Sequence, residues 1–264
     1  MDLGLRGKKA LVTGSTGGIG LATARAMARE GAHVFVNGRT GERVERARKE
    51  ILAAVPGATV EAAVGDISSA EGASGIVRAL PAVDILVNNA AVFEPKPFAE
   101  ITDDDWRRFF ETNVLGGVRL SRAYFPGMLK KGWGRIVFVS SESALQIPVE
   151  MIHYGTTKIA QLGVARGLAE LPAGTSVTVN SVLPGPTLSD GASEFVAQLA
   201  SAKGIDSKAV EREFFQTMRP SSLLKRFATV DEVANMIVYV CSAAASATNG
   251  AALRVDGGVV RAVV

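Results

Sequence analysis

The sequence holds a single cysteine, Cys241, and therefore cannot form an internal disulfide bond. A chain without disulfides is typical of a reducing compartment, so we expect a cytoplasmic protein. Cys241 lies in the apolar, helix-like stretch VANMIVYVCS. This position predicts a packing role in the core rather than a nucleophile.

Long apolar runs and blocks of like charge are also missing. Although 47% of the residues are hydrophobic, no run of 18 or more occurs, and a bilayer-spanning helix needs about 20. The first residues, MDLGLRGKKALVTG, lack the pattern of a secretory leader. The net charge is +3, with bases interspersed among acids as in GERVERARKE. We therefore expect no membrane span, no nucleic-acid partner and no metal site.

A strand, a glycine turn and a helix follow one another near the start of the chain. Lys8–Val12 (KKALV) predicts a strand, Thr13–Gly20 (TGSTGGIG) a turn, and LATARAMAREG a helix. In this context a glycine turn indicates phosphate binding, because backbone N–H groups can approach a pyrophosphate at a positive helix end. The spacing of Gly14, Gly18 and Gly20 differs from the common G-x-G-x-x-G pattern.

The end of the second predicted strand, Ala32–Asn37, bears on the choice of dinucleotide. A carboxylate there would hold the free 2′-hydroxyl of NAD, whereas an arginine accommodates the 2′-phosphate of NADP. The chain has Arg39 at this point and no carboxylate before Glu42. Arg39 therefore favours NADP(H), with NAD as the alternative if Arg39 is only a solvated turn residue.

Strands and helices continue to alternate through the rest of the chain. Further strands are expected at 59–63, 83–92, 134–141, 176–182 and 251–255, and helices at 41–53, 69–80, 103–129, from Tyr154 to 169, and 230–241. The pattern predicts an α/β fold of Rossmann type: a doubly wound, parallel, seven-stranded sheet in the order 3-2-1-4-5-6-7. We expect one domain, 1–264, with a mobile substrate lid at about 188–226.

Polar residues follow several of the predicted strands. Asp66 either caps the next helix or binds an adenine amino group. Asn88 and Asn89 end the fourth strand, Ser141 ends the fifth, and Pro184 follows the sixth. Because ligands of open α/β sheets bind outside the carboxyl ends of the strands, these residues should border one crevice.

Tyr154 and Lys158 are four residues apart in a stretch expected to be helical, so both side chains share one face. An ammonium ~4 Å from a phenolate supplies about 4 kcal/mol at an effective dielectric near 20, but only about 1 in water. Burial acts in the opposite direction, so the pair forms an acid/base only where the lysine charge outweighs burial. Taken alone, the spacing favours two surface residues that lie four apart by chance, and the rest of the chain has to decide.

Asn113 lies within the long predicted helix, just before the glycine pair Gly116-Gly117. Asparagine and glycine are poor choices for a regular helix interior. The pattern predicts a local irregularity that turns a backbone carbonyl inward.

From about Lys8 to Gly258, the chain resembles the short-chain dehydrogenase/reductase family, in particular its 3-oxoacyl-[acyl-carrier-protein] reductase-like members. The motifs that carry the resemblance occur in register: TGSTGGIG, Asp66, NNAA, Asn113, Ser141, YGTTK, PGPT and VDGG. The spacings of 13 residues from Ser141 to Tyr154 and 41 from Asn113 to Tyr154 are close to those of family members.

The resemblance implies a catalytic tetrad of Asn113, Ser141, Tyr154 and Lys158. Ser141 would hydrogen-bond the substrate oxygen, and Tyr154 would exchange its proton as hydride moves to or from the nicotinamide. Lys158 would lower the pKa of Tyr154 and bind the nicotinamide ribose, while Asn113 would hold a water that links Lys158 to solvent. The implied cofactor contacts are Gly14, Thr16, Gly18, Ile19, Gly20, Arg39, Asp66, Ile67, Asn88, Ala90, Tyr154, Lys158, Pro184, Gly185 and Thr187.

Several positions depart from the family pattern. Ala91 replaces the usual glycine after NNA, and either Thr187 or Ser189 could be the cofactor ligand. Gly17 stands where many NADP-preferring members carry a base, so the NADP preference depends on Arg39 alone. His153 adjoins Tyr154 in the chain but should face elsewhere on the helix.

The leading hypothesis is an NADP(H)-dependent oxidoreductase acting on a carbonyl/secondary alcohol pair. The alternative is a non-catalytic dinucleotide-binding regulator or scaffold on the same fold. The apolar segment SALQIPVEM favours an apolar substrate, with 3-oxoacyl thioesters, ketones, sugars and sterol-like compounds as candidates. The resemblance also implies a homo-oligomer, tetramer or dimer, which the apolar GGVVRAVV at 257–264 supports.

Overall fold

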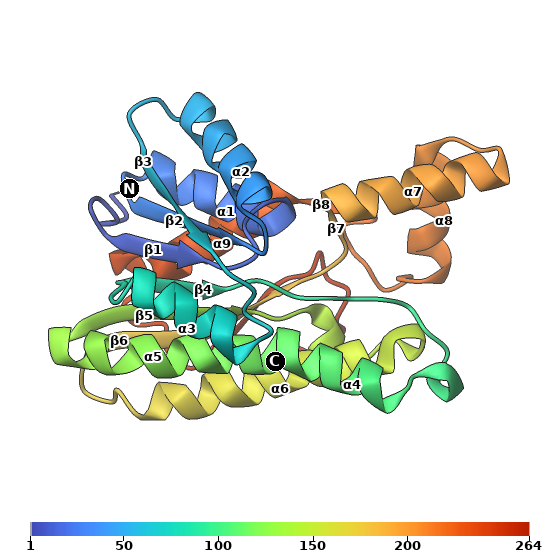
Figure 1. The fold of residues 1–264 in the computed structure, drawn as a ribbon. Helices are drawn as coiled ribbons and strands as arrows, with labels where there is room; N and C mark the ends of the chain where they lie inside the picture. Colours follow the sequence, from blue (N-terminus) through green and yellow to red (C-terminus); the bar gives the residue numbers. More distant parts are fainter. Residues whose placement is uncertain (1, 264) are drawn as a thin grey trace.

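A parallel sheet of seven strands forms the centre of the molecule, with helices packed on both faces (Figure 1). The computed structural model describes residues 2–263, apart from the side chains of Asp190 and Phe195. The strands are β1 (Lys9–Val12), β2 (His33–Gly38), β3 (Thr59–Val64), β4 (Ile85–Asn88), β5 (Trp133–Val139), β6 (Ser176–Pro184) and β9 (Ala252–Val255). Their spatial order, β3-β2-β1-β4-β5-β6-β9, confirms the predicted topology, because β9 is the seventh strand of this sheet along the chain.

Two groups of helices cover the sheet, one group on each face (Figure 1). One face packs against α1 (Gly18–Arg29), α2 (Gly41–Ala54) and α9 (Val230–Cys241). The opposite face packs against α3 (Ala70–Ala79), α5 (Gly116–Lys131) and α6 (Ile152–Glu170), while α4 (Asp103–Phe110) lies against α6. Short turns of helix occur at η1 (Phe98–Glu100), η3 (Glu142–Ala144), η4 (Val149–Met151) and η5 (Ala243–Ala245).

The side chains of each strand point alternately to the two faces of the sheet, which explains why both faces need a layer of helices. In β1, Ala10 and Val12 join one hydrophobic cluster, and Leu11 joins the cluster on the opposite face. In β5, Val137 and Phe138 divide in the same way. Successive side chains of a strand point to opposite faces, so a continuous apolar run is stable only when both faces are covered.

The helix predicted at 103–129 is divided by a π-helical turn, η2 (Glu111–Leu115), between α4 and α5. This confirms the irregularity expected around Asn113. The glycine pair has a packing reason: a Cβ at Gly116 would lie 2.8 Å from Cδ1 of Ile67, and one at Gly117 would lie 2.9 Å from Cε1 of Phe138. The π-helical turn packs against α6, where the side chain of Asn113 donates to Oγ1 of Thr157 at 3.0 Å.

Asp66 does not cap α3. The cap is Ser69, whose Oγ accepts a hydrogen bond from the backbone N of Gly72 at 3.0 Å. Asp66 Oδ1 instead accepts from the backbone N and Oγ of Ser68, at 2.9 and 2.7 Å. The carboxylate thereby holds its own turn after β3, because an aspartate readily accepts from a backbone N–H two residues on.

Helices α7 (Asp190–Lys203) and α8 (Ser207–Thr217) pack against each other and project to one side of the sheet, orange in Figure 1. A small apolar cluster of Val196, Ala200 and Val210 holds the two helices together. Their connections to the main body pair as two short parallel strands, β7 (Thr187–Leu188) and β8 (Ala228–Thr229). These elements occupy the segment at about 188–226 for which the sequence predicted a substrate lid.

Cys241 is fully buried at the end of α9, which confirms its predicted packing role. Burial raises the pKa of its thiol to about 12, and the nearby guanidinium of Arg135 opposes this rise. None of the helices within residues 2–263 combines the length and apolar character that a membrane crossing requires.

Candidate active site

The carboxyl ends of β1, β4, β5 and β6 open onto one cavity of about 1240 Å³. Most of the residues predicted for the site from the sequence line this cavity, and only two do not. They are Gly14, Thr16, Gly18, Ile19, Gly20, Arg39, Asp66, Ile67, Ala90, Ser141, Tyr154, Lys158, Pro184, Gly185 and Thr187. Asn88 and Asn113 are the exceptions.

The glycine turn after β1 brings main chain to the cavity wall. Gly14 and Gly18 have φ angles of +60° and +55°, in the region that favours glycine. A Cβ at Gly20 would lie 2.5 Å from Nδ2 of Asn89, the amide that donates to the carbonyl oxygens of Thr13 and Gly14. Helix α1 begins at this turn without an acidic residue in its first turn. Its positive end therefore suits an anionic group such as a pyrophosphate.

Two arginines line the cavity beyond β2. Arg39 and Arg43 are exposed, and within the described part of the chain neither is ion-paired with a carboxylate. Asn37, by contrast, is fully engaged: its Oδ1 accepts from the backbone N of Gly14 at 3.2 Å, and its Nδ2 donates to the carbonyl oxygen of Ala63 at 2.8 Å. Asn37 thus fixes the glycine turn, and the two guanidinium groups remain for a ligand.

Asn88, expected as a cofactor contact, is not among the residues that line the cavity. It is 3% exposed and turns toward α5, where Nδ2 donates to Oγ of Ser121 at 3.2 Å. The next residue, Asn89, lines the cavity and holds the glycine turn. Ala90 also lines it, with its backbone N bonded to Oγ1 of Thr13 at 3.0 Å.

The end of β6 forms another wall. Pro184, Gly185, Thr187 and Ser189 all line the cavity. Thr187 Oγ1 donates to the carbonyl oxygen of Gly185 at 2.9 Å, and Ser189 caps α7. Both hydroxyl residues predicted as alternatives therefore face the same space.

Ser141, Tyr154 and Lys158 converge at the centre of the cavity. Ser141 follows β5 and caps η3, while Tyr154 and Lys158 lie one turn apart on α6. Tyr154 and Ser141 are hydrogen-bonded, and Lys158 Nζ lies 5.5 Å from the centre of the Tyr154 ring. The preceding residue, Ser140, instead ties β5 to α6, because its Oγ donates to the backbone oxygen of Lys158 at 2.9 Å. The structure thus places a hydroxyl, a phenol and an amine around one point.

A buried glutamine links Lys158 to Asn113. Gln161 Oε1 accepts from Lys158 Nζ at 3.2 Å, and Gln161 Nε2 donates to the backbone oxygen of Asn113 at 2.6 Å. Lys158 Nζ also donates to the backbone oxygen of Val139 at 2.9 Å. The inward carbonyl predicted at Asn113 is therefore present, and a carboxamide connects it to the amine. Sequence reasoning missed Gln161, which lies on the same face of α6, three residues after Lys158.

Burial governs the ionisation of the two groups on α6. It lowers the pKa of Lys158 from 10.5 to about 7. Burial, followed by the negative charge of Glu142, raises the pKa of Tyr154 above its usual value, and the hydrogen bond with Ser141 opposes this. The expected dominance of the lysine charge over burial is therefore not seen in this structure, because an amine with a pKa near 7 is only partly charged at neutral pH.

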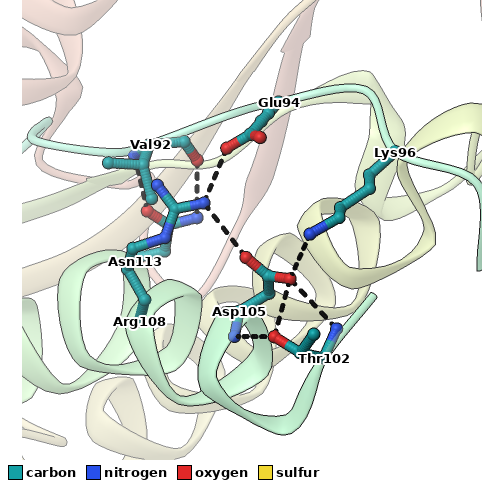
Figure 2. A network of polar contacts seen from close by, with 7 residues as sticks. All are labelled: Val92, Glu94, Lys96, Thr102, Asp105, Arg108 and Asn113. Atoms are coloured by element: carbon teal, nitrogen blue, oxygen red, sulfur yellow. Dashed lines mark hydrogen bonds and ion pairs between the residues drawn. The ribbon is translucent and has the colours of Figure 1, made fainter. Parts of the chain in front are cut away.

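The side chain of Asn113 fastens the segment Val92–Lys96, which follows β4 (Figure 2). Its Oδ1 accepts from the backbone N of Val92 at 2.8 Å, and its Nδ2 donates to the Val92 oxygen at 3.0 Å. Two ion pairs hold the same segment on α4: Glu94 with Arg108 at 2.6 Å, and Lys96 with Asp105 at 2.6 Å. The network fixes one wall of the cavity.

Phe93, at the centre of that segment, packs edge-on against Tyr154 with ring centres 6.3 Å apart. His153 points the other way, as predicted: it is fully buried and its ring centre lies 4.1 Å from that of Phe109 in α4. Burial lowers the pKa of His153, so the ring is neutral. It takes no part in the cavity lining.

Two charged residues beside the triad of side chains escaped the sequence reasoning. Glu142 and Arg219 line the cavity and form an ion pair at 3.2 Å, although 77 residues separate them. The acidic neighbour of Ser141 was a signal in the sequence, but nothing in the sequence placed Arg219 opposite it.

Comparisons with known proteins give a consistent family. The family model described as short chain dehydrogenase matches residues 8–200. The "uncharacterized oxidoreductase YvaG" of Bacillus subtilis is 44% identical over 263 residues, covering 100% of both chains. The 3-oxoacyl-[acyl-carrier-protein] reductase FabG of Aquifex aeolicus is 32% identical over 98% of this chain and 99% of its own. The crystal structure of L-sorbose reductase from Gluconobacter frateurii with NADPH and L-sorbose superposes with a TM-score of 0.94 at 32% identity, covering 100% of each chain.

Proposed function

The chain belongs to the short-chain dehydrogenase family, and we propose that it is an NADP(H)-dependent oxidoreductase that interconverts a carbonyl and a secondary alcohol. The observation that carries this proposal is the convergence of Ser141, Tyr154 and Lys158 in the cavity that the glycine turn also lines. A hydroxyl, a proton donor and an amine at one point are what a carbonyl needs as negative charge develops on its oxygen.

The cavity fits a dinucleotide by its own geometry. A side chain at Gly20 would collide with Asn89 and with the backbone oxygen of Gly14, so only glycine leaves this wall open. The positive end of α1 faces the same space. When bound there, the nicotinamide would supply hydride to a ketone or accept it from an alcohol. Gly14, Gly18 and Ile19 would hold the pyrophosphate part.

Arg39 and Arg43 support the choice of NADP(H). Two guanidinium groups that form no ion pair with a carboxylate of the described residues lie at one wall, where each can form two parallel hydrogen bonds to a phosphate. The structural neighbour L-sorbose reductase was solved with NADPH. We expect Arg39→Ala and Arg43→Ala each to raise the Kd for NADPH about tenfold, a loss of roughly 1.4 kcal/mol, with little change for NADH. Equal effects on both nucleotides, measured by fluorescence titration, would contradict the assignment.

The proposed chemistry assigns one task to each side chain. Tyr154 gives its proton to the carbonyl oxygen in reduction and takes it back in oxidation. Ser141 hydrogen-bonds the same oxygen, and Lys158 stabilises charge on the phenol and binds the nicotinamide ribose. Asn113 holds Val92 with its side chain and Gln161 with its backbone oxygen, and so keeps both the cavity wall and the lysine in place.

We propose that α7 and α8 act as a substrate lid. Phe214 and Met218 line the cavity from this side, opposite Phe93 and Met151. The lining is apolar there, yet Glu142 and Arg219 lie beside it, so both apolar ketones and hydroxy-ketones belong in the substrate panel. The proposal also includes a single domain and a homo-oligomer, a tetramer or a dimer, which analytical ultracentrifugation would distinguish.

The test of the proposed function is Tyr154→Phe, assayed by NADPH oxidation with L-sorbose, apolar ketones and 3-oxoacyl thioesters. We expect turnover to fall at least a thousandfold while the Kd for NADPH stays within about twofold, because the phenol hydroxyl gives the proton but the cavity is intact. Trp106→Phe on α4, away from the cavity, is the matched aromatic control and should keep full activity. Equal turnover in Tyr154→Phe and the parent would overturn the assignment.

A further inference from the structure

A group of charged side chains beside Ser141 has no role in the chemistry described so far. Glu142 Oε1 accepts from Nε of Arg219 at 3.2 Å, and Glu150 Oε1 accepts from Nη1 of Arg219 at 3.4 Å. The side chains of Glu142 and Arg219 are only 6% and 11% exposed, whereas that of Glu150 is 28% exposed. A buried carboxylate normally requires a partner, and Arg219 provides it.

Glu142 determines how the Ser141 hydroxyl is used. Ser141 Oγ donates its single hydrogen to Oε2 of Glu142 at 2.6 Å and accepts from the backbone N of Ser143 at 3.1 Å. A hydroxyl has a single hydrogen, so Ser141 can donate to a substrate oxygen only when this hydrogen turns away from Glu142. Glu142 therefore competes with the substrate for the Ser141 hydrogen.

The charge of Glu142 acts on Tyr154 as well: a nearby negative charge disfavours a phenolate and so raises the pKa of Tyr154. Three other charged groups surround this point: Lys158 from α6, Glu150 from η4 and Arg219 from the turn after α8. Arg219 lies directly on Glu142 and has the opposite sign, so it reduces the field that Glu142 exerts on the phenol.

Arg219 is fixed to the end of α8 rather than to the sheet. Its backbone N donates to the oxygen of Phe214 at 3.0 Å, its Nη1 donates to the oxygen of Met218 at 2.9 Å, and its guanidinium carbon lies 5.9 Å from the Phe214 ring centre. The Glu142–Arg219 pair is thus a buried polar contact between the α7–α8 unit and the end of β5.

We propose that Glu142 and Arg219 are positioning residues of the catalytic centre: Glu142 holds the Ser141 hydroxyl and its charge acts on Tyr154, and Arg219 offsets that charge when α8 is packed in place. The proposal rests on the proposed function. It couples the position of the α7–α8 unit to the protonation of Tyr154 through the charge of Glu142.

The test is the pH dependence of kcat/KM for alcohol oxidation, which requires ionised Tyr154. Glu142→Gln keeps an acceptor for Ser141 but removes the charge, so we expect the rising limb to move about one pH unit toward acid. Arg219→Met leaves Glu142 without its main counter-charge, so the limb should move about one pH unit toward alkali. The double variant removes both charges and should return close to the parent profile.

Two further variants separate charge from packing. Arg219→Lys keeps the positive charge and should keep the parent profile. Arg226→Met removes an arginine whose partner, Glu232, is on the exposed surface, and it should shift nothing. In cofactor-free protein, the urea midpoint should fall more for Arg219→Met than for the double variant, because an unpaired buried carboxylate is more destabilising than the loss of both partners.

The inference fails if the profiles of Arg219→Met and the parent coincide, or if Arg219→Met and Glu142→Gln shift the limb in the same direction. Should Arg219→Met not fold, Glu142→Gln and Arg219→Lys decide the question by themselves: a parent profile in Glu142→Gln overturns the proposal. Failure of the proposed function is a separate outcome, because then the parent turns over no carbonyl and Tyr154→Phe changes nothing.

Discussion

Replacing Lys158 by methionine should remove the contribution of this amine to the rise in the free energy of unfolding with pH in the alkaline range. The amine is 2% exposed, and burial lowers its pKa from 10.5 to about 7. The gap between these two values corresponds to about 5 kcal/mol. Between pH 7 and 10.5 the unfolded chain keeps a proton on Lys158 that the native protein has lost. The unfolded state therefore binds more protons, and the free energy of unfolding rises with pH.

Methionine has a similar length and no charge, so Lys158→Met lacks this rise. The free energy of unfolding of the parent, minus that of the variant, should increase by about 4 kcal/mol from pH 7 to pH 10.5. The variant also loses the hydrogen bonds to Val139 and Gln161, each worth about 1–2 kcal/mol. We therefore expect it to be at least as stable as the parent at pH 7 and less stable at pH 10.5, while turnover disappears.

The assay is urea unfolding of the cofactor-free protein, followed by circular dichroism at pH 7, 8, 9, 10 and 10.5. Lys49→Met, which replaces an exposed lysine on α2, is the matched control for the loss of a lysine. A constant difference between the parent and Lys158→Met across the whole range would refute the reasoning, because it would mean that the native amine keeps its proton as readily as the unfolded one.

Three other substitutions test the packing and hydrogen bonds around the site. Gln161→Leu removes a hydrogen-bond acceptor from the Lys158 amine, so the free energy of unfolding at pH 7 should fall by about 1.5–3 kcal/mol, as measured by urea unfolding. In steady-state assays kcat should fall as well. An unchanged kcat would contradict a positioning role for Gln161. Gly20→Ala pushes a Cβ against Asn89, so it should destabilise by about 1–3 kcal/mol and weaken NADPH binding, as thermal unfolding and fluorescence titration would show. Gly163→Ala on α6, where nothing lies within 4 Å, should instead stabilise by about 0.5–1 kcal/mol, and the reverse order of the two effects would count against the close-packing argument.

The sheet and the strand ends that border the cavity could be predicted from local, periodic signals, whereas the tetrad and most of the other lining residues were predicted from the family resemblance. The run KALV before TGSTGGIG marks a buried strand and its turn, and parallel strand ends meet at one edge whatever the details of packing. Asn113 could be singled out because asparagine and a glycine pair are unfavourable inside a regular helix. These arguments need only neighbours in the chain.

Long-range contacts between side chains could not be obtained in this way. Arg219 meets Glu142 only because α8 brings it back across the cavity, and no periodicity in the sequence encodes that return. Asn88 and Asn89 show the same limit, since strand β4 ends between them and sends their side chains in different directions. The balance between burial and charge at Tyr154 likewise depends on distances and on how far the amine is itself desolvated.

The single thiol, at the end of α9, can report how often α9 separates from the sheet. With a pKa near 12 and no exposed surface, Cys241 should be inert to maleimides and disulfide reagents as long as α9 stays on the sheet. Any labelling at neutral pH then measures how often that helix detaches, at one position and without an engineered tag. A ligand that binds the native protein and stabilises it against this opening should slow the labelling in proportion to its binding. The measurement does not require the substrate of the protein to be known.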